Sequence, residues 1–189
     1  MAVSEAKNKR VQVVTPRGEH RHYLPTALAW PSGSAVSGEH LFVAQQMGAG
    51  LQKLRLDGTL VARAGGDFQR QAEWIESALG VLVRASTVFV ADVTQYRVNA
   101  YDEESLQLKF SIGAASLQRS PTGCQPRLAS HGGSYAGPSC FNPHGVAASK
   151  GHGGRLFVTD PDNNCVQVFR LTGEVSVSRR EPTTSRKRK

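Results

Sequence analysis

Two stretches of this chain align with each other without a gap, Leu41 to Gly66 and Val88 to Gly113, at an offset of 47 residues. A third copy begins at Leu156, and a partial copy opens the chain at Met1. In each copy an apolar run ends in an acidic or amide residue, and a second apolar run starts six residues later. One small sheet cannot bury both of its faces alone, so short strands repeated at this period are typical of stacked four-stranded sheets.

The spacing predicts where the strands lie in each copy. The last copy shows the order most clearly, because Gly, Pro and Asn turn signals separate its apolar runs. We expect an inner strand near 145–148, then strands over 155–159, 165–171 and 174–178. The N-terminus matches this copy from its second strand onward, so the chain is predicted to contain three strands followed by three sets of four, fifteen in all.

Composition places the chain among ordinary folded proteins. It has 189 residues, of which 39% are apolar and 20% charged, values near the globular average. No apolar run is long enough to span a membrane, and the N-terminus lacks the apolar core of a secretory signal. The three cysteines, Cys124, Cys140 and Cys165, are odd in number and show no CxxC spacing. We therefore expect free thiols in a reducing compartment, and an intracellular protein that makes no membrane contact.

Charge and periodicity divide the chain into two parts. Residues 1–178 carry the repeats, apart from an aperiodic segment rich in Ser, Gly and Pro near 114–140, which we interpret as a disordered insertion. Residues 179–189 form a basic tail that holds +5 of the net charge of +8, so the remainder holds only +3. The tail is predicted to be disordered, and it suits a nuclear import signal in an otherwise cytoplasmic protein.

The repeats resemble NHL repeats. In that family a Pro-x-Gly-Val turn leads into an apolar strand ending in Asp, then a short Asn-containing turn, an Arg-Val strand and a closing Gly. Residues 141–173 match most of this pattern, 88–113 match its middle and end, and 30–66 match its frame. The resemblance implies an all-β propeller of the NHL type, incomplete in this chain, with about four four-stranded blades in an open arc. Because an open arc exposes sheet faces and edges, we also expect self-association that completes the ring.

In two of the four copies, an acid at the end of the second strand can pair with an arginine at the start of the third. Glu5 with Arg10, and Asp92 with Arg97, are predicted to form charge-assisted pairs. The copy at Gln45 has lost both partners. Asp160 lacks an arginine, so we expect it to be exposed or to bind the side-chain amide of Asn163 or Asn164. A structural role is favoured for all of these residues.

Candidate chemistry is sparse. His20 and His22 alternate on one strand, but they sit where polar residues face water, and solvation is favoured over zinc binding. Propeller hydrolases hold a cation with carboxylates and amides from inner strands, whereas the inner strands here contain no carboxylate. No phosphate loop, GxSxG elbow or HExxH motif occurs. The sequence thus predicts no enzyme, no catalytic residues, no metal and no cofactor.

We therefore expect a noncatalytic scaffold or adaptor whose turns dock a protein partner. The alternatives are RNA binding through basic turns and tail, as some NHL propellers do, and, as the weakest option, a metal-dependent propeller hydrolase or lyase. The predicted partner-binding residues are Lys7, Lys9, Arg10, Tyr96, Arg97, Asn163 and Asn164.

Overall fold

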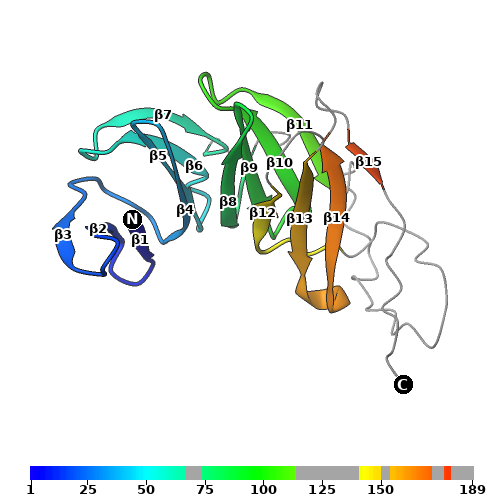
Figure 1. Ribbon diagram of the computed structural model, residues 1–189, viewed down its shortest axis with the longest axis horizontal. Coiled ribbons are helices and arrows are strands. Elements are labelled where there is room, and N and C mark those ends of the chain that lie inside the picture. The colour runs from blue at the N-terminus through cyan, green and yellow to red at the C-terminus, as the bar shows by residue number, and fades with distance from the viewer. Residues whose placement is uncertain (67–73, 114–140, 150–153, 172–176, 180–189) are drawn as a thin grey trace.

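The computed structural model describes residues 1–66, 74–113, 141–149, 154–171 and 177–179. Residues 177–179 are described by their backbone alone. Over these residues the chain is all-β, with fifteen strands in four small antiparallel sheets and one short 3-10 helix. The sheets follow one another along the chain and lie side by side in a curved row (Figure 1). In the described part of the chain this row does not close into a ring.

Each sheet is a simple meander in which neighbouring strands follow one another in sequence. The first sheet contains β1 (Ala2–Glu5), β2 (Arg10–Val14) and β3 (His20–Tyr23). The second contains β4 (Pro31–Ser37), β5 (His40–Gln45), β6 (Leu51–Arg55) and β7 (Leu60–Ala64). The third contains β8 (Ala78–Arg84), β9 (Thr87–Asp92), β10 (Arg97–Asp102) and β11 (Leu108–Gly113). The fourth contains β12 (Val146–Ala148), β13 (Arg155–Asp160), β14 (Cys165–Leu171) and β15 (Val177–Arg179), with the 3-10 turn η1 (Pro161–Asn163).

The predicted order of three strands followed by three sets of four is therefore confirmed for the described residues. Arg179, the first residue of the predicted tail, pairs with Phe169 at the end of β15. The predicted insertion at 114–140 and the rest of the tail, 180–189, lie outside the described residues.

Apolar clusters fill the space between successive sheets. Val11 of the first sheet packs with Leu41 and Val43 of the second, and Phe42 of the second packs with Val88 and others of the third. Phe89 of the third sheet packs in turn with Leu156 and Val158 of the fourth. Because side chains alternate across a strand, the odd and even positions of each middle sheet bury against different neighbours. Each middle sheet therefore needs a neighbour on both sides to bury its apolar side chains.

Glycines let the inner strands of adjacent sheets approach closely. A Cβ on Gly33 of β4 would lie 2.3 Å from the Leu79 carbonyl oxygen of β8. A Cβ on the equivalent Gly80 of β8 would lie 2.5 Å from the His144 carbonyl oxygen, just before β12. The same glycine position therefore allows close backbone approach both between β4 and β8 and between β8 and the segment that leads to β12.

Burial differs between the middle and the end of the row. Every residue of β9 is buried, whereas β13, its equivalent in the fourth sheet, alternates between exposed and buried positions. One face of the fourth sheet is therefore covered by the third sheet, and none of the other described sheets packs on its opposite face. None of the described helical segments has the length and apolarity that a membrane span requires.

Candidate docking face

The turns between the second and third strands of the four sheets share one hydrogen-bonded geometry. In each turn the backbone N–H of the last residue donates to the carbonyl three residues earlier, which closes a tight turn. These bonds are Lys9 to Ala6 at 3.1 Å, Ala49 to Gln46 at 3.4 Å, Tyr96 to Val93 at 3.2 Å and Asn164 to Pro161 at 3.0 Å. The four turns are thus structural equivalents, as the repeat alignment predicted.

Several residues at this end of the sheets adopt left-handed backbone, which bulky L-residues rarely do. Trp30, just before β4, has φ of 52°, and Met47 and Tyr96 have φ of 61° and 54°. Their side chains are exposed by 37%, 74% and 41%, respectively. We call the surface at this end the turn face, and it comprises Lys7, Lys9, Trp30, Met47, Tyr96 and Asn164.

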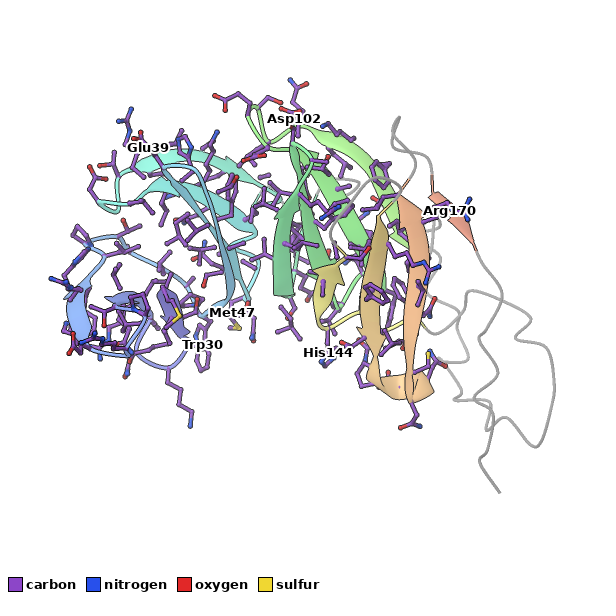
Figure 2. All side chains as sticks on the ribbon, viewed as in Figure 1. Trp30, Glu39, Met47, Asp102, His144 and Arg170 are labelled. Carbon is purple, nitrogen blue, oxygen red and sulfur yellow. The ribbon has the colours of Figure 1, made fainter. Side chains whose placement is uncertain are left out.

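Backbone hydrogen bonds between segments fix the turn face. The Gln46 N–H donates to the Trp30 carbonyl at 3.1 Å. The Gly48 N–H donates at 2.8 Å to the carbonyl of Glu76, which lies just before β8. Figure 2 shows Trp30, Met47 and His144 along one side of the row, with Glu39 and Asp102 on the opposite side. Backbone hydrogen bonds at Trp30 and on either side of Met47 therefore tie this surface to the neighbouring segments.

Charge is unevenly distributed over the turn face. The first turn contributes Lys7 and Lys9, both exposed, whereas the second and third turns contain no charged residue. The fourth turn contributes the exposed acid Asp162. The turn face therefore has one basic end rather than a continuous basic stripe.

The first acid–arginine pair forms as predicted. Arg10 Nε and Nη2 donate to the two Glu5 oxygens at 3.1 and 3.0 Å, and the Asn8 side chain also donates to Glu5. The hydrogen bond from Arg10 lowers the pKa of Glu5. The Arg10 guanidinium also stacks 3.7 Å above the Tyr23 ring. Arg10 is thus half-buried and engaged at the base of its turn.

The second pair is buried and more loosely joined. Arg97 Nε lies 3.8 Å from Asp92 Oδ2, and Arg97 Nη2 donates to the Trp74 carbonyl at 2.8 Å. Asp92 is fully buried and Arg97 is 9% exposed. Arg97 is therefore absent from the exposed turn face where the sequence had placed it. Its role is to link the end of β10 to the segment before β8.

Burial raises the pKa of Asp92 to about 7, and the Arg97 charge offsets this effect only in part. Between the ordinary value of 3.8 and about 7, the folded chain therefore keeps a proton that the unfolded chain has lost. The stability that Asp92 contributes is present at low pH and falls as pH rises through this window.

We expect Asp92→Asn to remove this dependence. The free energy of unfolding of the variant should fall less between pH 4 and pH 7 than that of the parent, by a few kcal/mol at about 1.4 kcal/mol per pKa unit. Urea titrations across this range measure the difference, with the exposed Asp162→Asn as the control. Parallel pH profiles for the parent and Asp92→Asn would contradict the buried, protonatable carboxyl.

The side-chain oxygens at the two remaining equivalent positions accept hydrogen bonds from amides. Gln45 Oε1 accepts a hydrogen bond from the Ala29 N–H at 2.7 Å. Asp160 is fully buried and accepts from Asn163 Nδ2 at 2.9 Å and Gln167 Nε2 at 2.6 Å. The predicted Asn163 donor is confirmed, while Gln167 was missed because its amide reaches Asp160 from the next strand.

An open pocket of about 440 Å³ lies beside this turn of the fourth sheet. It is lined by His144, Thr159, Asp160, Pro161, Asn164, Cys165 and Val166. Burial, and then the Asp160 charge, raise the pKa of the Cys165 thiol, which is the opposite of what activates a cysteine nucleophile. Both Asp160 oxygens are already engaged by amides. The pocket can accept a side chain, but its groups are not arranged for nucleophilic attack.

Metal-binding geometry is absent from the part of the chain that the structure describes, where no three His, Cys, Asp or Glu side chains cluster. His20 and His22 lie exposed on β3. His20 stacks on Tyr23 with ring centroids 4.4 Å apart, and its Nδ1 lies 3.3 Å from Gln12 Oε1.

No known family model matches the chain, and no curated protein matches it in sequence. Solved structures share its fold at low identity. The computationally designed Ika8 protein is 9% identical with a TM-score of 0.56, and the match covers 90% of this chain and 42% of that one. The designed Ika4 protein is 9% identical with a TM-score of 0.57, covering 89% and 83%.

A natural example is a functionally unknown protein from Desulfotomaculum acetoxidans, 13% identical with a TM-score of 0.64, covering 94% of this chain and 49% of that one. This chain therefore spans less than half the length of both Ika8 and the Desulfotomaculum protein. At these identities the likeness shows the fold alone.

Proposed function

We propose that this chain is a noncatalytic protein-binding scaffold, built as an open arc of an NHL-type β-propeller, whose turn face docks a partner protein. The observation that carries the proposal is the set of three exposed side chains, Trp30, Met47 and Tyr96, fixed in left-handed backbone at one end of the sheets. Unusual backbone of this kind is retained where the surrounding structure enforces it, and it concentrates at functional sites.

The chemistry of these side chains suits a protein interface. Trp, Tyr and Met are enriched in the buried centres of such interfaces, and aromatic side chains are frequent hot spots. Because the supporting turns are tied by backbone hydrogen bonds, binding would order little further structure and would lose little affinity to that cost. The matching partner presents an apolar side chain to Trp30 and Met47, and carboxylates to the basic end at Lys7 and Lys9.

The charge distribution favours a protein over RNA. Single-stranded RNA needs cations along its backbone path together with stacking aromatics, whereas the second and third turns carry no charge and the fourth carries Asp162. A labelled RNA oligonucleotide should therefore bind only weakly. Tight binding whose affinity falls steeply with salt would instead support the RNA alternative.

We expect Tyr96→Ala to weaken partner binding by about tenfold or more, the effect of losing one aromatic hot spot. Quantitative pull-downs with the full chain would compare the parent, Tyr96→Ala, Asn163→Ala with Asn164→Ala, and Leu56→Ala. Leu56 is a matched control because it is also exposed, by 47%, but follows β6 at the opposite end of its sheet.

Proteins captured by the parent and by Leu56→Ala, but lost from Tyr96→Ala, would support the turn face. If Tyr96, Asn163 and Asn164 can all be substituted while every specific partner stays bound, the assignment is wrong.

A further inference from the structure

The uncovered face of the fourth sheet is built like faces that are covered elsewhere in the chain. Leu156 and Val158 of β13 pack against the third sheet, so Phe157 between them faces away from it. The equivalent phenylalanines, Phe42 and Phe89, are 0% and 1% exposed against the next sheet along the chain. Phe157 is only partly buried, and no further sheet packs on it among the residues that the structure describes.

The neighbouring strand repeats this difference. Val166 of β14 is 54% exposed, whereas its equivalents in the first three sheets, Val11, Leu51 and Val98, are fully buried. The face of the fourth sheet that carries Phe157 and Val166 therefore has the residue types that pack between sheets elsewhere in the chain, but here these residues are not fully buried.

The first sheet presents the complementary face. Met1 and Val3 are exposed by 65% and 40%. They align with Leu41 and Val43 of the second sheet, which are 1% and 0% exposed and pack on the preceding sheet. The same two positions are also fully buried in the third and fourth sheets. Met1 and Val3 thus lie where a preceding sheet would pack.

We propose that these two surfaces bind each other between two copies of this chain: the first sheet of one copy packs on the outer face of the fourth sheet of the other. In this contact Val3 meets Val166, as Val43 meets Val11 within one chain. The occupant is a second copy because the chain itself carries both halves of the contact, with matching residue types at matching strand positions.

Two such contacts related by a two-fold axis close the row into a ring, whereas a single head-to-tail contact would leave it open. Two of the solved structures extend well beyond the part that this chain matches, which is 42% of Ika8 and 49% of the Desulfotomaculum protein, whereas the match covers 83% of Ika4. The contact uses sheet faces and leaves the turn face free. It is therefore independent of the proposed scaffold function.

Sedimentation equilibrium of the full chain tests the contact. The parent should show a concentration-dependent mass that reaches twice that of one chain. Val166→Asp and Val3→Asp should each shift the association constant by 100-fold or more toward the single chain, because each would bury an unpaired carboxylate in the contact. Both sites are exposed in one copy, so either variant should still fold.

The decisive variant combines Val3→Asp with Val166→Lys. Its opposite charges meet only between copies, so association should be restored to within about tenfold of the parent. Val61→Asp, at a 45% exposed position on the outer strand β7, is the control and should associate like the parent. A parent that stays a single chain at all concentrations, or association that survives Val166→Asp, would overturn the proposal.

Discussion

Replacing Phe89 with alanine should lower the free energy of unfolding by about 3–5 kcal/mol, the usual cost of removing a buried phenylalanine ring. Phe89 is 1% exposed in the apolar cluster between the third and fourth sheets. Its ring meets that of Phe110 edge-on, with centroids 6.3 Å apart. Removing the ring leaves a cavity between the two sheets. The hydrogen bonds within each sheet restrict how far its strands can move to fill this cavity.

Phe157→Ala is the matched control, because Phe157 holds the same repeat position on the uncovered face. Its loss should be about 1–2 kcal/mol when measured at a concentration where the chain is single, since the lost burial is only partial. Urea denaturation of both variants provides the comparison. Equal losses, or a larger loss for Phe157→Ala, would contradict the placement of these residues in stacked sheets.

Gly80→Ala should also be strongly destabilising, by about 3 kcal/mol, the upper end for an overpacked site. The added Cβ would lie 2.5 Å from the His144 carbonyl oxygen and 3.1 Å from the Val146 nitrogen. Both contacts are with backbone, at His144 just before β12 and at Val146 within it, so relief requires the two inner strands to separate.

Gly145→Ala is the control for this effect, because Gly145 holds the equivalent position in the last sheet. Its nearest contacts would be with the Thr159 side chain, at 3.1 Å and beyond, and none of the described strands lies against it as β12 lies against Gly80. Thermal unfolding should show a clearly smaller drop for Gly145→Ala than for Gly80→Ala. The reverse order would mean that the inner strands are not packed in the order β4, β8, β12.

Most of the fold could be predicted from the sequence because strand pattern and turn spacing are local properties that the repeat shows several times. The run from Val88 to Asp92 predicted β9 with its terminal acid, and the match at Glu5 located the partial first sheet. Burial could not be read in the same way, since it depends on which sheet covers which face. Val98 and Val166 look alike in sequence, yet only Val98 is buried.

The candidate site was less predictable for the same reason. Arg97 looked like a surface cation beside a turn, but the Trp74 carbonyl, 23 residues earlier in the chain, draws it into the interior. Trp30 precedes Pro31, a position where extended backbone is favoured, and contacts across the sheet hold it at a φ of 52° instead. Such tertiary constraints leave no signal in the local sequence, so Trp30 and Met47 were not among the predicted residues.

Amide hydrogen exchange along the chain tests most directly whether four equivalent sheets stack in sequence. The third sheet is covered on both faces, so the amides of β9 and β10 should exchange most slowly. Those of β1 and β3, at the edges of the end sheet, should exchange fastest among the strands. At a concentration where the chain is single, fast exchange across β9 and β10, or protection of β1 and β3 equal to theirs, would contradict the stacked arrangement.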